Sequence, residues 1–326
     1  MRTPFLLKPV PKDYLWGGSR LNDEFNLNLP ADPLAEAWMC STHPDGQSYV
    51  PSFDCTLGEL LLNKPSYLGR HALQITEGVI TLPILIKLID AKSDLSVQVH
   101  PDDEYAKLTE NSLGKTEMWY VLEANSNTSL VYGFNQNMNR DNFESVLQSG
   151  EIEKYLNYVP VHKDDLFFIE AGIVHAIGAG ALIAEIQESS NITYRLYDYD
   201  RFDKNGNKRP LHIEKALEVI DFQASNSPRQ PMRVLKYKKG CASELLARCK
   251  YFQVERVLIN SEPKQEPVRF KTENNSFHVL LCIDGYGEIK GTDFFLSFFK
   301  GDCIFVPAES IDLCINGKAQ ILDVSC

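Results

Sequence analysis

The segment DLSVQVHPDD, residues 94–103, reads as a short β-strand that carries two side chains suited to a divalent metal. Side chains two residues apart on a strand point to the same face, so Gln98 and His100 can reach one point in space. Val99 packs against the opposite face. Because Pro101 ends the strand, we expect His100 at a strand end that faces the mouth of a β-sandwich.

Two further strand-like segments supply partners for this pair. In GKTEMWYVLEA, residues 114–124, Glu117 lies among apolar residues beside Lys115, and a buried carboxylate there needs a counter-charge. In DDLFFIEAGIVHAIGAG, residues 164–180, a turn precedes His175 and returns the chain toward the other ligands. Two imidazoles, one carboxylate and one amide oxygen suit zinc and leave a position open for water or substrate. The sequence therefore predicts one zinc ion, or another divalent metal, per chain, held by Gln98, His100, Glu117 and His175.

Length and composition limit the class of protein. A chain of 326 residues exceeds one typical core, and its 44% hydrophobic and 24% charged residues are ordinary for a soluble globular protein. No apolar run is long enough to cross a bilayer, and the N-terminus lacks a signal segment, so we expect a cytoplasmic monomer or homodimer. The net charge of −11 disfavours nucleic acid as a partner. Eight scattered cysteines without a CxxC pair favour free thiols.

From about residue 75 onward the sequence is dominated by short β-type runs separated by Gly, Asp and Asn, and such runs return after the polar stretch at 223–231. They predict a mainly β fold of the sandwich or jelly-roll type. The segment FKGDCIFVPA at 299–308 repeats the layout of HKDDLFFIEAG at 162–172, which indicates an internal duplication. We therefore expect two β-sandwich units, at 1–222 and 223–326.

Short helices are expected to interrupt the strands of the first unit. Residues 139–159 place acidic and apolar side chains at helical intervals, with Asn139 or Asp141 as the N-cap. Residues 211–222 and 57–65 predict two more helices. The N-terminal segment is expected to wrap a sheet because its mixture of aromatic, Pro and Gly residues predicts no core of its own.

The second unit is expected to bind no metal. Where the first unit has His175, the second continues ESIDLCING, and its His278 lacks acidic and imidazole companions at the required spacing. Packing is the expected role of this unit.

The segment AEIQESSNITYRLYDYDR, residues 184–201, is a second concentration of polar side chains. Glu185 and Arg195 lie in strand-like alternation with their neighbours. A guanidinium at the mouth of a metal site suits a phosphate or a developing enediolate, because it stays cationic and donates in a fork. The alternative is a surface ion pair between Arg195 and Asp198.

Taken in order, the segments QVHPDD, GKTEMWYVL, AGIVHAIGAG and AEIQESSNITYRLYDYDR, with WGG and AEAWMCSTHPDG upstream, resemble the type I phosphomannose isomerases of the cupin superfamily. The likeness runs over most of the chain and is greatest to the short bacterial form. Two elements depart from the family pattern, with Ala35 in AEAW and Asn191 in SNITYR. The resemblance implies two cupin-like jelly-roll units with short helical insertions, the first catalytic and the second degenerate.

The resemblance also implies an activity. Members of the family are metal-dependent aldose–ketose isomerases that interconvert mannose 6-phosphate and fructose 6-phosphate through a cis-enediol. Matching the motifs implies zinc on His100, Glu117 and His175, with Gln98 as a fourth ligand that some members use. Arg195 is implied as the catalytic arginine.

Several roles in such a site stay open at this point. Lys115 matches a lysine that lines the family's pocket, and it is a candidate catalytic residue. The proton could be carried by Lys115, Glu185, His43 or a metal-bound water. We expect Lys115, Glu185 and Ser41 to bind the phosphorylated sugar. Two rival functions are a cupin dioxygenase with iron or copper, and a non-catalytic sugar-binding or regulatory cupin.

Overall fold

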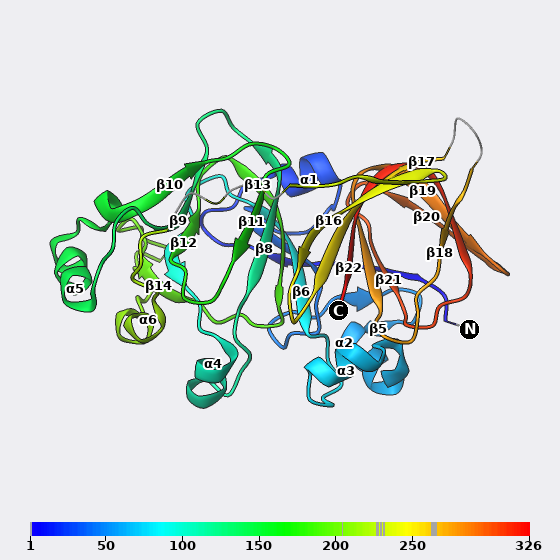
Figure 1. Ribbon diagram of the computed structural model, residues 1–326, viewed down its shortest axis with the longest axis horizontal. Coiled ribbons are helices and arrows are strands. Elements are labelled where there is room, and N and C mark those ends of the chain that lie inside the picture. Colours follow the sequence, from blue (N-terminus) through cyan, green and yellow to red (C-terminus); the bar gives the residue numbers. More distant parts are fainter. Residues whose placement is uncertain (1, 204, 226–227, 229, 231, 262–265) are drawn as a thin grey trace.

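The computed structural model describes the whole chain except residues 1, 204, 226–227, 229, 231 and 262–265 (Figure 1). Two β-rich units lie side by side, with short helices at their periphery (Figure 1). The predicted mainly β fold with few, short helices is confirmed. The division at residue 222 remains a proposal, because the two units are joined by a shared core.

The first unit contains a six-stranded sheet and a five-stranded sheet, both antiparallel in every pairing. Trp119 and Ile183 of the larger sheet share a buried cluster with Leu130 and Ile177 of the smaller sheet, so the two sheets form a sandwich. The larger sheet has the order β11 (Leu166–Ile169), β8 (Glu117–Ala124), β13 (Ala181–Glu188), β6 (Ile84–Asp90), β3 (Glu36–Cys40) and β2 (Val10–Lys12). The smaller has the order β10 (Leu156–Pro160), β9 (Ser129–Phe134), β12 (His175–Ile177), β7 (Val97–Val99) and β14 (Tyr194–Tyr197).

The second unit is built on a nine-stranded sheet whose longest strands, β19 and β22, pair along most of their length. The order of the sheet is β1 (Phe5–Leu7), β21 (Cys303–Val306), β19 (His278–Gly291), β22 (Leu313–Ser325), β17 (Gln253–Asn260), β16 (Cys241–Arg248) and β15 (Lys236–Lys238). Two further strands pair outside this path, β18 (Val268–Phe270) with β22 and β20 (Phe294–Phe299) with β19. A separate two-stranded sheet consists of β4 (Tyr49–Val50) and β5 (Cys55–Thr56).

The N-terminal segment contributes strands to both units. Strand β1 pairs with β21 of the second unit, with Phe5 opposite Phe305, whereas β2 pairs with β3 of the first unit. The segment therefore lies within two sheets, where the sequence had indicated only that it wraps one. Its pairing with β21 ties the two ends of the chain together.

Helices form in all three segments where the sequence predicts them, but the helix expected over 139–159 ends at Gly150, whose φ of +71° is left-handed, and residues 156–159 belong to strand β10 instead. Side-chain caps explain where two of the three helices begin. The side chain of Asn139 accepts from the backbone N–H of Asn142, and Thr56 and Glu59 form a capping box. No helix in the described part of the chain is long and apolar enough to span a membrane. The helices are α1 (Arg20–Phe25), α2 (Leu57–Asn63), α3 (Arg70–Ile75), α4 (Asp103–Thr109), α5 (Arg140–Ser149) and α6 (Ile213–Val219), with 3₁₀ turns at Pro65–Tyr67 and Ile152–Tyr155.

A hydrophobic core runs between the two units. Ile86 and Met118 of the first unit belong to the same buried cluster as Phe277 and Phe305 of the second. The ring of Phe305 stacks on Phe277 and on Phe5, with both centroid distances 5.2 Å. Because neither unit can expose this surface without a large loss of hydrophobic burial, we infer that the units are stabilised together.

Replacing the central ring of this core tests that inference. Phe305→Ala should lower the free energy of unfolding by about 3–5 kcal/mol, because it leaves a cavity between two stacked rings. Phe299→Ala is the control, since that side chain is 61% exposed; its expected loss is below about 1 kcal/mol. Denaturant unfolding measures both. Similar losses in the two variants would contradict the shared core.

Candidate active site

Three buried side chains meet between the two sheets of the first unit. His100 follows β7, Glu117 begins β8 and His175 begins β12. Their potential ligand atoms all lie within 4.8 Å of one another, the one such group found among the described residues. The Nε2 atoms of the two histidines are 3.1 Å apart, and Glu117 Oε1 is 3.3 Å from Nε2 of His100. The structure thus brings together three of the four predicted ligands.

Gln98, the fourth predicted ligand, lies at the edge of this group. Its Cα is paired with that of His175 across β7 and β12, and its Nε2 is 3.5 Å from Nε2 of His175. Rotation of the carboxamide by half a turn exchanges its nitrogen and oxygen, which have nearly the same shape. The amide oxygen can therefore be presented to the same point as the imidazoles.

A tight turn places the ring of His175 and fixes its tautomer. Gly172 has a φ of +88° and its N–H donates to the carbonyl of His100 over 2.9 Å. The next residue, Ile173, offers its carbonyl oxygen 2.7 Å from Nδ1 of His175. Nδ1 therefore carries the proton and donates it to this carbonyl, which leaves the lone pair of Nε2 directed at the group. This is the arrangement that a metal-ligating histidine requires.

Burial keeps both imidazoles neutral. It lowers the pKa of His175, and burial together with the neighbouring Lys115 lowers the pKa of His100 to about 3. Neutral imidazoles and an ionised carboxylate are the forms in which these side chains bind metal. The donor set and its protonation therefore fit a divalent metal ion.

Lys115 supplies positive charge to the buried carboxylate of Glu117. Its Nζ lies 2.5 Å from Glu117 Oε1 and 3.0 Å from Nε2 of His100. Burial alone would raise the pKa of Glu117, but Lys115 and then His100 hold it well below the ordinary value. Glu117 is therefore an anion in the folded protein, although its side chain is wholly buried.

A second buried charge network adjoins the first and was missed by the sequence analysis. Lys87 Nζ is 2.9 Å from Glu185 Oε1 and 3.6 Å from Glu36 Oε2. Trp119 Nε1 donates to Glu185 Oε2 over 2.8 Å and lies 3.1 Å from Glu117 Oε2, so the indole joins the two networks. The single lysine in the apolar run of β6 was the signal that could have revealed this network.

Members of both charge networks line a cavity of about 270 Å³, just below the range of typical small-molecule sites. The candidate residues Lys115, Glu185 and Arg195 are among its lining residues, and Gln98 is the one predicted metal ligand that lines it. The full lining is Tyr14, Trp16, Glu36, Lys87, Ile89, Leu95, Ser96, Gln98, Lys115, Ile177, Glu185, Asn191, Thr193, Arg195 and Arg209.

Ser41 and His43 are not part of this lining. Ser41 is fully buried, and its hydroxyl donates to the carbonyl of Gly46 over 2.6 Å and accepts from the N–H of His43 over 3.1 Å. The loop of Ser41 is connected to the cavity lining through Asp45, which accepts a hydrogen bond from Asn191. The hydroxyl of Ser41 is therefore occupied within its own loop.

Arg195 projects from β14 and makes no ion pair with Asp198. Its Nε donates to Ser96 Oγ over 3.2 Å and its Nη1 to the carbonyl of Pro210 over 2.9 Å. Asp198 instead binds Arg201 and Arg209. The alternative interpretation of Arg195 as half of a surface ion pair is thus wrong.

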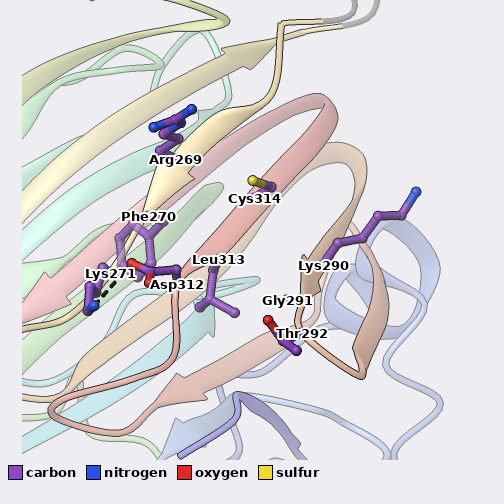
Figure 2. A pocket seen from close by; sticks show the side chains of 9 residues that line it. All are labelled: Arg269, Phe270, Lys271, Lys290, Gly291, Thr292, Asp312, Leu313 and Cys314. Carbon is purple, nitrogen blue, oxygen red and sulfur yellow. Dashed lines mark ion pairs between the residues drawn. The ribbon is translucent and has the colours of Figure 1, made fainter.

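A larger cavity of about 580 Å³ lies on the second unit (Figure 2). Lys271 is paired there with Asp312 over 3.0 Å, and Figure 2 shows the side chain of Lys290 pointing away from the other lining residues. The lining contains no histidine. Elsewhere in this unit Nδ1 of His278 lies 2.7 Å from Oδ1 of Asp323, an acidic neighbour that the spacing in the sequence did not indicate. Strand pairing brings together these two residues, which are distant in sequence.

The fold and the buried His–Glu–His group define a cupin-type protein with a candidate metal centre. Two family models match, "Phosphomannose isomerase type I, catalytic domain" over residues 5–132 and "Mannose-6-phosphate isomerase, cupin domain" over residues 243–326. The chain belongs to the type I phosphomannose isomerase family, a family of enzymes.

Curated relatives and solved structures agree with this membership. The chain is 34% identical to mannose-6-phosphate isomerase ManA of Bacillus subtilis over 98% of both chains. It is 31% identical to mannose-6-phosphate isomerase of Streptococcus mutans, over 99% of this chain and 98% of that protein. The crystal structure of mannose 6-phosphate isomerase from Bacillus subtilis superposes with a TM-score of 0.87 at 32% identity, covering 99% of both chains.

Removal of a ligand should lower bound metal. His100→Ala and His175→Ala should each weaken binding of a divalent metal by more than the about 10–100-fold typical of losing an outer-shell partner, because a direct donor is lost. Metal analysis after dialysis against a graded chelator measures this. Lys115→Ala, which removes a contact with two ligands but no donor, should weaken metal binding less than either histidine variant. Full metal occupancy in both histidine variants would exclude the assigned ligands.

Acid should destabilise the metal-free protein through His100. Its pKa is about 3 when folded and 6.5 ordinarily, so between these values the unfolded chain binds a proton that the folded chain does not. Stability is therefore full above pH 6.5 and falls as the pH drops toward 3. Thermal unfolding between pH 6.5 and 5 should vary less steeply with pH in His100→Gln. His162→Gln, altering a side chain that is 82% exposed, should keep the wild-type slope, and an unchanged slope in His100→Gln would refute the assignment.

Proposed function

We propose that this chain is a zinc-dependent mannose-6-phosphate isomerase, which interconverts mannose 6-phosphate and fructose 6-phosphate through a cis-enediol. The observation that carries the proposal is the meeting of two neutral imidazoles and one carboxylate beside a cavity lined by Lys115, Glu185 and Arg195. Membership of the type I phosphomannose isomerase family supports it.

Zinc is the metal that this donor set suits best, because nitrogen and carboxylate ligands in a compact buried group match its usual coordination. His100, Glu117 and His175 would hold it, with Gln98 as a fourth ligand. When bound, zinc supplies a fixed positive charge that stabilises negative charge on the sugar oxygens.

The remaining chemistry falls to the charged residues of the cavity. Isomerisation moves a proton between C1 and C2, and the group that carries it must come within about 3 Å of both carbons. Lys115 is the candidate catalytic residue, since its Nζ adjoins both the metal group and the cavity. Glu185 would bind sugar hydroxyls, because Lys87 holds its Oε1 and Trp119 its Oε2 in fixed positions.

Arg195 would complete the electrostatic stabilisation of the enediolate. Its guanidinium donates to two neutral oxygens and has no carboxylate partner among the described residues, so its positive charge remains available to an anion. Ile89, Leu95 and Ile177 form apolar parts of the same cavity wall. Such surroundings strengthen the interaction between a fixed cation and a developing anion.

A cupin dioxygenase is the rival enzymatic function, because the same ligands could hold iron or copper. The cavity also contains Lys87, Lys115, Arg195 and Arg209, and this number of cations suits a phosphorylated substrate. A non-catalytic sugar-binding cupin would use the same cavity without turnover.

An isomerase assay separates these functions. Purified protein should convert mannose 6-phosphate to fructose 6-phosphate, lose the activity after chelation and regain it with zinc. Substrate conversion is followed by coupled reduction of a nicotinamide cofactor, and oxygen uptake is followed with an electrode. Oxygen uptake without isomerisation would instead establish the dioxygenase.

Loss of the Arg195 guanidinium should reduce turnover. Arg195→Ala should lower kcat by about a hundredfold or more, the usual effect of removing one preorganised donor to a developing anion. Arg248→Ala, which removes an exposed arginine of β16, is the control and should keep wild-type kcat. Steady-state kinetics on both variants measure kcat. An unaltered kcat in Arg195→Ala would remove this residue from the mechanism.

A further inference from the structure

A pair of carboxyl groups lies where the first unit meets the second. Glu188 is the last residue of β13 and is only 1% exposed. Asp103 is the first residue of α4, and its Oδ2 accepts from Tyr251 Oη over 2.6 Å and from Lys250 Nζ over 2.9 Å. Lys250 and Tyr251 belong to the turn between β16 and β17. Asp103 therefore connects α4 to the second unit.

Glu188 and Asp103 share one proton. Their side chains form a hydrogen bond with each other, and one of the two must carry a proton, because an ionised carboxylate only accepts. Without that proton, Oε2 of Glu188 would be buried with no donor among the described residues. Two ionised carboxylates side by side in a buried place are strongly destabilised. One carboxyl of the pair is therefore an uncharged acid.

The proton resides on Glu188. Burial, followed by the charge of Asp103, raises the pKa of Glu188 to about 8. Burial alone would also raise the pKa of Asp103, but the hydrogen bonds from Tyr251 and Lys250 lower it to about 2. Among the described residues, the titratable side chains that face Glu188 are Asp103, Lys250, Tyr251 and Cys249. The one ammonium among them, that of Lys250, is bound to Asp103. At neutral pH Glu188 is thus an acid that donates to an ionised Asp103.

The same two carboxyl groups hold the backbone on either side of Lys115. The N–H of Gly114 donates to Asp103 Oδ1 over 3.1 Å. The N–H of Thr116 donates to Glu188 Oε1 over 2.7 Å. The side chain of Lys115 lines the cavity and contacts the metal group. The position of its ammonium therefore depends on a backbone segment that the carboxyl pair fixes at both ends.

We propose that Glu188 is a positioning residue, which acts as an uncharged acid and, together with Asp103, holds the segment 114–116 so that Lys115 faces the cavity. Neither carboxyl is among the residues that line the cavity, so the pair acts through Lys115 and not on the substrate. Loss of the proton to solvent would place two negative charges side by side, and their repulsion would separate the groups that hold the segment. The part of Lys115 in turnover rests on the proposed function, whereas the shared proton rests on the carboxyl pair itself.

Glu188→Gln tests this role, because a carboxamide can accept from Thr116 and donate to Asp103 but cannot ionise. The two proteins should have equal kcat for mannose 6-phosphate at pH 7. Between pH 7 and 9 the wild-type kcat should fall about tenfold further than that of Glu188→Gln, as expected when a group with a pKa near 8 must stay protonated. Steady-state kinetics across this range measure both profiles. Identical alkaline losses would overturn the proposal.

Two further variants complete the comparison. Glu104→Gln removes the same charge from an exposed residue of α4 and should keep the wild-type pH profile. Glu188→Leu removes both hydrogen bonds and should lower kcat at every pH by about tenfold to a hundredfold, the scale of a reacting group misplaced by about 1 Å. Circular dichroism checks that each variant is folded.

Thermal unfolding gives a reading that needs no turnover. Glu188 has a pKa of about 8 when folded and 4.5 ordinarily, so between these values the folded chain holds a proton that the unfolded chain does not. The stability that this proton contributes is full below pH 4.5 and is lost as the pH rises through 8. The wild-type melting temperature should therefore fall relative to that of Glu188→Gln as the pH rises from 7 to 9. The contribution of His100 is constant above pH 6.5 and does not interfere.

Hydrogen exchange reports directly on the segment that carries Lys115. At pH 9 the amides of residues 114 and 116 should exchange faster in the wild type than in Glu188→Gln, because repulsion within the carboxyl pair opens their hydrogen bonds. At pH 7 the two proteins should exchange these amides equally. Mass spectrometry of the peptide that contains the segment measures the rates.

The outcomes separate this proposal from the proposed function. If melting and exchange follow the predicted pH dependence but the protein does not isomerise mannose 6-phosphate, the proposed function fails and the role of Glu188 in holding the segment stands. If the protein isomerises the sugar and Glu188→Gln has the wild-type pH profile, the role of Glu188 fails and the proposed function stands. A difference in melting without one in exchange or kcat would also overturn the positioning role.

Discussion

The burial of a charged carboxylate is the constraint on which the candidate site depends. Glu117 lies at 0% exposure, and an isolated carboxylate there would be strongly destabilising. The ammonium of Lys115 and the two imidazoles surround it, and Trp119 places an N–H beside its second oxygen. Such an arrangement stabilises an anion in a low-dielectric place and leaves nitrogen lone pairs directed at a common point. A fold that keeps these charged and polar groups around Glu117 also keeps a binding site for a cation.

The packing of the two units holds the side chains around Glu117 at fixed distances from one another. His100 and His175 come from the smaller sheet of the first unit and Glu117 from the larger, so the distances in the site depend on how the two sheets pack. The larger sheet is in turn covered by the second unit through the core around Phe277 and Phe305. The second unit thus contributes to the site by packing, in agreement with the role expected from its sequence.

Local patterns in the sequence explain which predictions were confirmed. Alternation on a strand placed Lys115 and Glu117 on one face, and short-range capping signals placed α5 after Asn139. Lys87 and Arg209 were missed for a different reason. Lys87 is part of the site because it lies directly opposite Glu185 across β6 and β13. Arg209 is part of it because it lines the same cavity as residues from other strands. In the sequence, a lysine in an apolar run and an arginine in a polar connection resemble many structural or solvated residues.

Residue identity and spacing alone determined the ligand types, the strand-rich character of the chain and the faces on which neighbouring side chains lie, because these follow from periodicity within single elements. The distances that turn those residues into a site were decided only by tertiary structure. Ser41 is an example. Its motif predicted a position at the site, whereas in the structure its hydroxyl forms hydrogen bonds within its own loop. Contacts between residues far apart in sequence depend on sheet packing and on competition among hydrogen-bond partners, and neither is encoded in any one segment.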